Sequence, residues 1–145
     1  MKLRIIIIED EPDVSELLED WLKEDNPWHE FKAFFNAASA FEFFQQELNK
    51  PPDMRALPHL IILDIRLPDQ SGLEVLKKIK TTPELKSIEI IVNTASDDPE
   101  HLCRAHRYGS CVFIRKADGR TAVLEAIQRL KTTGRVTGDK GKSKK

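Results

Sequence analysis

Short apolar runs and amphipathic segments alternate five times along this chain. Each apolar run is rich in branched aliphatic or aromatic residues, and each following segment carries apolar residues at helical spacing. This alternation is typical of βα units, because two parallel strands need a crossover connection that is usually a helix. Five units in about 130 residues are too few for an eight-fold barrel. We therefore predict an α/β fold with an open, doubly wound, five-stranded parallel sheet.

The apolar runs define five predicted strands. The first is a continuous β-branched run that should be buried on both faces and lie inside the sheet, whereas the second alternates poorly and should form an edge. The strands are predicted at Leu3–Ile8, Glu30–Phe35, Leu60–Leu63, Ile88–Asn93 and Cys111–Ile114.

Helical spacing of apolar residues defines the helices between the strands. The first begins at about Asp13 with Pro12 in its first turn, and the third follows the turn that ends at Gly72. The others are predicted at Ala37–Leu48, Pro99–Arg107 and Arg120–Lys131. Three prolines between the second helix and third strand predict a loop that is neither helix nor strand.

The size and composition of the chain favour one domain in the cytoplasm. The chain has 145 residues, of which 40% are apolar and 32% charged, so a single core is expected over residues 1–132. Its longest pure run near the start, Ile5–Ile8, is too short for a membrane span and is followed by acidic residues. Cys103 and Cys111 form no C-x-x-C motif, as expected in a reducing compartment.

Charge is distributed unevenly. Residues 129–145 hold seven basic groups and one acidic group, whereas the rest of the chain holds 16 basic and 23 acidic groups. An acidic body argues against direct DNA binding, because phosphate contacts need clustered lysine and arginine on a folded face. We expect residues 133–145 to be a disordered basic tail, too short for a DNA-binding domain.

Chemically active side chains follow four of the predicted strands. Ligands of doubly wound sheets bind beyond the carboxyl ends of the strands, so these side chains should share one site. Three carboxylates there would repel one another unless a cation lay between them, and oxygen ligands suit Mg²⁺. The hydroxyl and the ammonium could then hold phosphoryl oxygens. The residues are Glu9, Asp10, Asp64, Thr94 and Lys116.

Four stretches at these strand ends resemble the landmarks of bacterial response-regulator receiver domains, in order and in spacing. They are IIIIEDEPD, LIILDIRLPDQSGLEVL, IIVNTASDD and VFIRKAD. The resemblance covers roughly residues 3 to 131 and is specific because each stretch ends a strand that periodicity had assigned independently. It implies a flavodoxin-like fold of the CheY type, with strand order 2-1-3-4-5.

The resemblance also implies roles for individual residues. Asp64 would accept a phosphoryl group from a histidine kinase or a histidine phosphotransfer protein. Mg²⁺ would be held by Asp10, by Glu9 through water, by Asp64 and by the backbone carbonyl of Arg66. Lys116 would pair first with Asp64 and then with phosphoryl oxygen.

The resemblance further implies a phosphorylation-driven switch. Thr94 would hydrogen-bond the phosphoryl group, and its movement would be coupled to Phe113 on the fifth strand. The affected surface would contact a downstream protein, with no membrane involved, and homodimers are common in the family. Such a protein is not a conventional enzyme, although it assists its own phosphoryl transfer and dephosphorylation.

This chain departs from the family pattern at several positions. Ala117 stands where the family usually has proline after the lysine, so the Lys116–Ala117 bond should be either trans with a reshaped loop or strained. Phe113 replaces the more frequent tyrosine and lacks its hydroxyl. Arg66 and Ser96 stand where they could control access of water to the acyl phosphate.

Other functions fit the sequence less well. A phosphatase of the haloacid-dehalogenase type would need D-x-D after the first strand, and a Toprim-type site would need it after the third, where position 66 is arginine. His101, Cys103 and His106 do not share one helical face, which argues against a zinc site. A receiver fold that binds proteins without phosphorylation stays open as the alternative.

Overall fold

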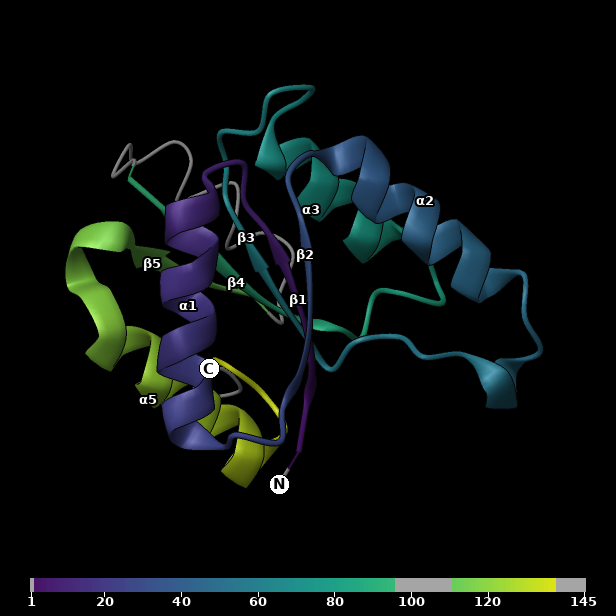
Figure 1. The fold of residues 1–145 in the computed structure, drawn as a ribbon. Helices are drawn as coiled ribbons and strands as arrows, with labels where there is room; N and C mark the ends of the chain where they lie inside the picture. Colours follow the sequence, from purple (N-terminus) through teal and green to yellow (C-terminus); the bar gives the residue numbers. More distant parts are fainter. Residues whose placement is uncertain (1, 96–110, 138–145) are drawn as a thin grey trace, which may run out of the picture.

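The protein forms one parallel sheet with helices on both faces (Figure 1). The structure is a computed structural model that describes residues 2–95 and 111–137. The strand order is β2-β1-β3-β4-β5 and every strand pair is parallel, which confirms the predicted doubly wound sheet. The strands are β1 (Arg4–Ile8), β2 (Glu30–Phe34), β3 (Leu60–Leu63), β4 (Glu89–Thr94) and β5 (Cys111–Arg115).

The described helices lie in two layers. One layer covers a core built on Leu18, Leu22 and Ile127, and the other covers a core built on Phe44 and Leu76. Figure 1 shows α1 and α5 on one side of the sheet and α2 and α3 on the other. The helices are α1 (Pro12–Asp25), α2 (Ala37–Leu48), α3 (Gly72–Thr81) and α5 (Gly119–Thr133). The helix predicted at Pro99–Arg107, with His101, Cys103 and His106, lies outside the described residues.

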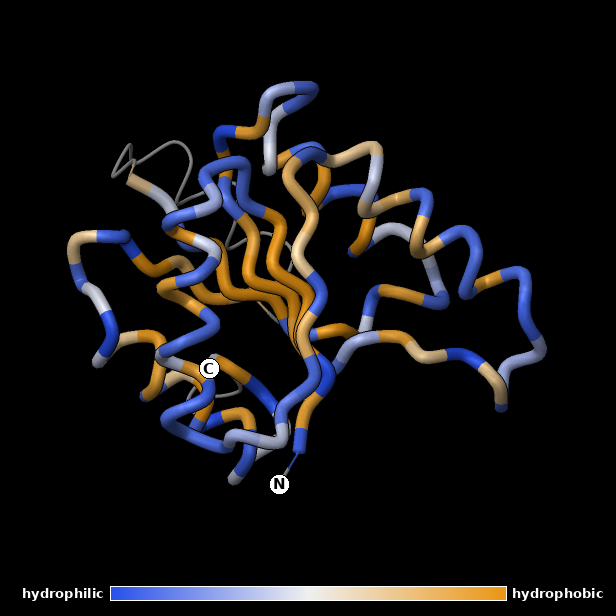
Figure 2. Tube along the Cα trace, in the orientation of Figure 1, coloured by the Kyte–Doolittle hydropathy of each residue, from blue (hydrophilic) through white to orange (hydrophobic). Residues whose placement is uncertain are grey.

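Strand β1 lies inside the sheet because its side chains are apolar on both faces. Ile6 and Ile8 pack into the core on the α2 and α3 side, whereas Ile5 and Ile7 pack on the α1 and α5 side. Figure 2 shows this apolar centre as adjacent orange strands, with hydrophobic and hydrophilic residues alternating along the helices beside them. Within the part of the chain that the structure describes, strand β2 pairs only with β1 and forms an edge, as its weaker alternation predicted.

The proline-rich connection between α2 and β3 is not wholly irregular, so the expectation of a segment without helix or strand was wrong in one detail. Pro52–Met54 forms a single 3₁₀ turn, η1. Proline suits the first position of such a turn, because its fixed φ is close to helical and the missing N–H would have no partner there.

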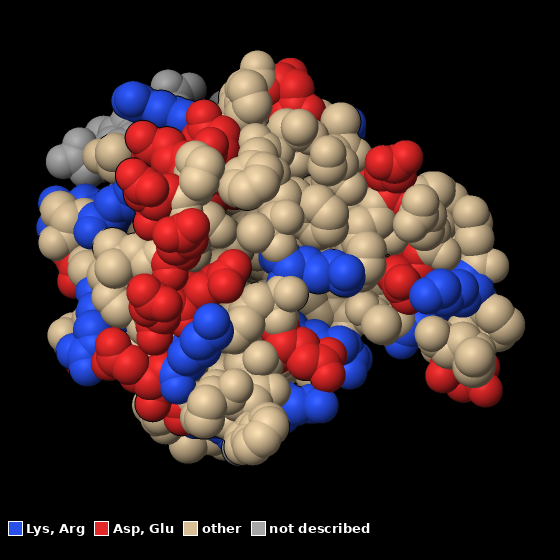
Figure 3. Space-filling view, viewed as in Figure 1, with Lys and Arg blue, Asp and Glu red and all other residues tan. Residues whose placement is uncertain are grey.

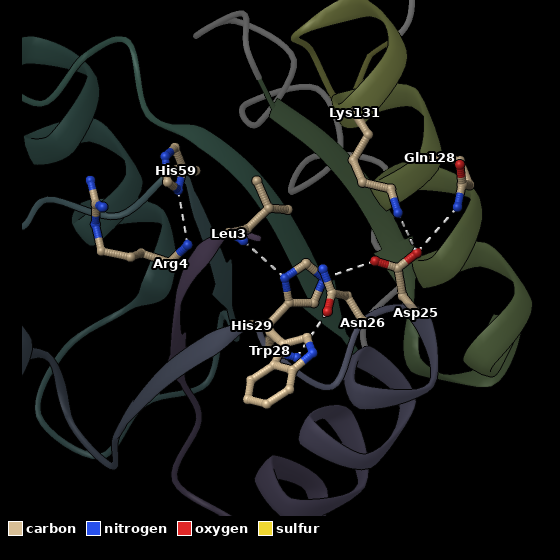
Figure 4. A network of polar contacts seen from close by, with 9 residues as sticks. All are labelled: Leu3, Arg4, Asp25, Asn26, Trp28, His29, His59, Gln128 and Lys131. Atoms are coloured by element: carbon tan, nitrogen blue, oxygen red, sulfur yellow. Dashed lines mark hydrogen bonds and ion pairs between the residues drawn. The ribbon is translucent and has the colours of Figure 1, made fainter. Parts of the chain in front are cut away.

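Two histidines hold the beginning of β1 at the amino edge of the sheet. The backbone N–H of Leu3 donates to His29 Nδ1, and that of Arg4 donates to His59 Nδ1, each at 2.9 Å (Figure 4). Since Nδ1 of His29 accepts a hydrogen bond, the proton of this ring is on Nε2, which lies 2.8 Å from Asp25 Oδ2. These rings fasten β1 to the starts of β2 and β3, at the edge opposite the predicted site.

Asp25 links α1 to α5 in the same region (Figure 4). Its Oδ1 accepts hydrogen bonds from Lys131 Nζ at 2.7 Å and from Gln128 Nε2 at 3.2 Å. Burial alone would raise the pKa of Asp25, but the hydrogen bonds from Lys131 and His29 outweigh it and lower that pKa. The carboxylate therefore stays ionised and joins the two helices through a buried ion pair.

The packed part of the chain extends beyond the expected boundary at residue 132. Helix α5 ends at Thr133, Gly134 adopts a left-handed conformation (φ 80°), and Val136 lies fully buried in the core under α1 and α5. The N–H of Val136 donates to Glu89 Oε1 at 2.9 Å, and its carbonyl accepts from Arg129 Nε. Residues 138–145 of the expected tail lie outside the described residues.

Among the described residues, no helix has the length and apolar character that crossing a membrane requires.

Candidate functional site

Three carboxylates meet at the carboxyl edge of the sheet. Glu9 and Asp10 follow β1, Asp64 follows β3, and the two strands pair in parallel with Ile8 opposite Leu63. One carboxylate oxygen from each of the three side chains lies within 4.8 Å of the others. Glu9 and Asp64 are buried, with 2% and 4% exposure, whereas Asp10 is exposed. The sheet thus brings together the acidic cluster that the sequence predicted.

Lys116 supplies the positive charge of the site. It follows β5, and its Nζ lies 3.0 Å from Glu9 Oε1, 3.5 Å from Asp64 Oδ2 and 3.6 Å from Glu11 Oε1. The lysine side chain is only 23% exposed, so solvent screens these ion pairs less than surface pairs. The contact with Glu11 was not predicted, because it depends on how the start of α1 turns back over the site.

Burial and charge shift the pKa values of two site residues. Desolvation raises the pKa of Glu9 to about 7, assisted by the negative charge of Asp64 and opposed by the hydrogen bond from Lys116. For Lys116, burial favours the neutral amine, but the hydrogen bond to Glu9 and the charges of Asp64 and Glu9 outweigh it and raise the pKa. The lysine is therefore cationic at neutral pH, whereas both the protonated and the ionised form of Glu9 are populated there.

The loop after β3 brings the backbone close to Asp64. The N–H of Arg66 donates to Asp64 Oδ1 at 3.3 Å, and Gly72 N–H donates to the carbonyl of Ile65 at 2.6 Å. A Cβ atom on Gly72 would overlap the carbonyl oxygen of Asp64 and the Cα of Ile65. Glycine is thus required here by the close approach of α3 to the backbone at Asp64.

Thr94 and Phe113 lie on the strands that complete this edge. Thr94 ends β4 and is fully buried, and β4 pairs directly with β3, which Asp64 follows. Phe113 stands opposite Val92 in the β4–β5 register and is half-buried against the core that contains α3. The structure therefore places Thr94 at the predicted edge and Phe113 one strand farther away. Ser96, the other residue expected near the phosphate, lies outside the described residues.

The Lys116–Ala117 bond is trans, the first of the two outcomes expected from the loss of proline. Lys116–Asp118 forms a 3₁₀ turn, η2, directly between β5 and α5. Gly119 follows with a φ of 68°, a conformation that glycine adopts without strain. With alanine in place of proline, this turn still directs the lysine toward Asp64.

The donor set fits a hard divalent cation. The three carboxylates offer oxygen only, and no sulfur or imidazole belongs to the cluster among the described residues. Such ligands suit Mg²⁺ or Mn²⁺ better than zinc or copper.

The surface beside the site is acidic. Figure 3 shows acidic side chains gathered over α1, which begins next to Glu9 and Asp10. The exposed members of this group are Glu11, Asp13, Glu16, Asp20 and Glu24. This face would repel a nucleic-acid backbone, in agreement with the charge distribution of the sequence.

Asp69 also belongs to the surroundings of the site, although the sequence indicated it only as a turn residue. Its carboxylate contacts the start of α2, 31 and 32 positions earlier in the chain. No local pattern indicates a contact over this separation; only the turn composition LPDQSG marks the segment.

Comparison with known proteins agrees with this geometry. The sequence profile of the response regulator receiver domain matches residues 5–128. Response regulator Rcp1 of Synechocystis sp. is 29% identical over 124 residues, which are 86% of this chain and 83% of Rcp1.

Two solved structures share the fold. The Mn²⁺-bound form of response regulator Rcp1 matches with a TM-score of 0.72 and 28% identity, covering 94% of this chain and 97% of that chain. The phosphorylated cyanobacterial phytochrome response regulator RcpA matches with a TM-score of 0.76 and 24% identity, covering 92% and 96%. The profile match over most of the chain shows that this protein belongs to the response regulator receiver domain family.

Proposed function

We propose that this protein accepts a phosphoryl group on Asp64 and thereby switches its contacts with a downstream protein. The observation that carries the proposal is the position of the buried Asp64 carboxylate, 3.5 Å from Lys116 Nζ and beside two further carboxylates. The donor would be the phosphohistidine of a histidine kinase or of a histidine phosphotransfer protein, and the protein would act in the cytoplasm.

A divalent metal, Mg²⁺ under cellular conditions, would be held at the acidic cluster. Its ligands would be Asp10, Asp64 and the backbone carbonyl of Arg66, with Glu9 acting through water. When bound, the metal supplies positive charge that neutralises the phosphoryl oxygens. The solved Mn²⁺-bound form of Rcp1, a related response regulator, supports the binding of a divalent ion.

The chain's own residues would position and neutralise the transferring group. A carboxylate oxygen of Asp64 attacks phosphorus in line, the P–N bond to the donor imidazole breaks, and its electron pair stays on that nitrogen, which is then protonated. The product is an acyl phosphate. Lys116 would move from the Asp64 carboxylate to a phosphoryl oxygen, and the Thr94 hydroxyl would donate to another.

The same groups would assist loss of the phosphoryl group to water, which makes the signal reversible. Binding of Thr94 to the phosphoryl group would favour one of two arrangements of Phe113 and its surroundings. The output would be a change in protein contacts, with a downstream protein or with a second copy of the chain, and not DNA binding by this domain. The protein would be a signalling phosphoacceptor and not a conventional enzyme.

The test is intact-protein mass after incubation with Mg²⁺ and a small acyl-phosphate donor. We expect the wild-type protein to gain one phosphoryl group, and Asp64→Asn to gain none because the amide is not a nucleophile. Chelation of the metal should abolish the gain as well. Asp53→Asn changes an exposed carboxylate outside the site and serves as the matched control. This variant should gain one phosphoryl group, as the wild-type protein does.

Absence of any phosphoryl gain, with the small donor and with a panel of histidine kinases, would contradict the proposal. The receiver fold would then act as a binding module that does not need phosphorylation. Phosphorylation of Asp64→Asn to the same extent as wild type would instead show that another residue is the acceptor.

A further inference from the structure

The loop that follows Asp64 is held by a backbone bridge at its base and by a contact with another element near its tip. Arg66 and Ser71 form an antiparallel bridge, and the Arg66 N–H donates to Asp64 Oδ1 at 3.3 Å. Between these two residues the chain runs through Leu67, Pro68, Asp69 and Gln70. A displacement of the tip would therefore be transmitted to Arg66, which contacts Asp64 directly.

Asp69, near the tip of this loop, attaches it to α2. Asp69 Oδ1 accepts a hydrogen bond from the Ala37 N–H and Oδ2 accepts one from the Ala38 N–H, both at 2.9 Å. These two bonds lower the pKa of Asp69, so the carboxylate is ionised at neutral pH. Figure 1 shows the β3–α3 loop above the turn from β2 into α2. Two bonds from one carboxylate restrict the direction of the loop as well as its distance from α2.

The start of α2 can serve as a firm support for this contact. The first N–H groups of a helix have no partner within the helix, and the helix dipole favours a negative charge there. Asn36 Oδ1 accepts the Ser39 N–H, whereas the two preceding N–H groups, those of Ala37 and Ala38, donate to Asp69. Ala37 and Phe44 anchor the helix in the core with 1% exposure or less.

We propose that Asp69 is a positioning residue for the phosphoryl-accepting site. Asp69 attaches the loop to α2 and so holds the Arg66 backbone in place. In this position the Arg66 N–H donates to Asp64, and the Arg66 carbonyl can coordinate the metal. The proposal rests on the proposed function, because it assigns Asp69 to that same site. The coupling is reciprocal, so binding of a metal at the site should stabilise the contacts at the start of α2.

The test compares two variants that each remove side-chain acceptors from the same helix end. Asp69→Ala removes the acceptors of Ala37 and Ala38, whereas Asn36→Ala removes the acceptor of Ser39 and leaves the loop attached. We expect Asp69→Ala to weaken Mn²⁺ binding on the order of tenfold in titration calorimetry, as for other residues that orient metal ligands. Asn36→Ala should leave the affinity within about twofold of wild type. Asp69→Asn, which keeps one acceptor oxygen, should recover part of the loss.

Hydrogen exchange gives a readout that does not depend on phosphorylation. In wild type, Mn²⁺ should slow exchange at the amides of Ala37 and Ala38, and this effect should disappear in Asp69→Ala but persist in Asn36→Ala. Urea unfolding should show that both variants remain folded and lose comparable stability, as expected for the loss of a helix cap.

Wild-type Mn²⁺ affinity in Asp69→Ala would overturn the inference. An equal loss of affinity in Asn36→Ala would overturn it too, because the effect would then come from the stability of α2. Wild-type protein that binds Mn²⁺ but accepts no phosphoryl group would refute the proposed function while leaving the role of Asp69 in metal binding intact.

Discussion

At the scale of single residues, Glu9 should make metal binding depend on pH. Burial raises its pKa to about 7 in the metal-free protein, and a cation must displace the proton that it holds. We expect Mn²⁺ affinity to rise as the pH increases from about 6 to about 8 and to fall in the opposite direction. Titration calorimetry at the two ends of this range checks the sign.

Glu9→Gln is the control, because the amide does not titrate. This variant should bind Mn²⁺ more weakly and with little change in affinity over the same pH range. An undiminished pH dependence would assign the change in affinity to another group.

Glu9 should also make the stability of the metal-free protein depend on pH. Its pKa in the folded protein lies above the reference value of 4.5, so its stabilising contribution to folding is present below pH 4.5 and is lost as the pH rises through about 7. Thermal melts of the metal-free protein should show this decline.

The site residues that could be predicted from sequence share one property. Glu9, Asp10, Asp64 and Lys116 each stand within two positions of the end of an apolar run, and parallel strands bring such positions to one edge. The contact of Asp69 with α2 could not be predicted in this way, because it joins a loop to the start of a distant helix, and their relative positions depend on the packing of α2 and α3.

At the scale of elements, the start of α3 should tolerate no side chain at Gly72. Alanine normally favours a helix over glycine, but here its Cβ would overlap the backbone of Asp64 and Ile65. We expect Gly72→Ala to lower the free energy of unfolding by about 2 kcal/mol. It should also weaken Mn²⁺ binding, because the backbone at Asp64 must move. Urea unfolding and metal titration measure the two effects.

Gly134→Ala gives the matched comparison. No atom lies within 4 Å of a Cβ at this position, so the cost comes only from the left-handed backbone with its φ of 80° and should be about 1 kcal/mol. Metal affinity should stay unchanged, and a loss equal to that of Gly72→Ala would mean that reduced stability alone weakens the site.

The predicted elements match best where a local signal defines their ends. Helix α2 has the predicted bounds, because Asn36 caps it and its apolar spacing is regular. The 3₁₀ turns at Pro52–Met54 and Lys116–Asp118 were not predicted, since single turns of this kind leave no periodic pattern.

At the scale of the whole molecule, the contrast between interior and edge strands could be predicted but the strand order could not. The apolar runs of β1 and β3 require cover on both faces, and both strands lie inside the sheet. Periodicity does not specify which strand lies next to which, so the order 2-1-3-4-5 came from the family resemblance and the structure confirms it.

The segment after α5 should contribute to the stability of the whole domain. Val136 is fully buried and its backbone is tied to Glu89 and Arg129. We expect Val136→Ala to lower the free energy of unfolding by about 2 kcal/mol, because it removes buried methyl groups and leaves a cavity. The neighbouring Arg135 is exposed, and Arg135→Ala should stay within about 0.5 kcal/mol of wild type. Equal urea midpoints for both variants and wild type would contradict this role.

The positive charge of Lys116 also affects which charge of cation the proposed metal site would favour. When fully ionised, Glu9, Asp10 and Asp64 carry three negative charges and Lys116 carries one positive charge, which leaves two negative charges in the cluster. A divalent cation brings this sum to zero, whereas a monovalent cation leaves it negative. At the proposed metal site, selection of the ion by charge, in addition to selection by oxygen ligands, would thus depend on side chains that follow three separate strands, β1, β3 and β5.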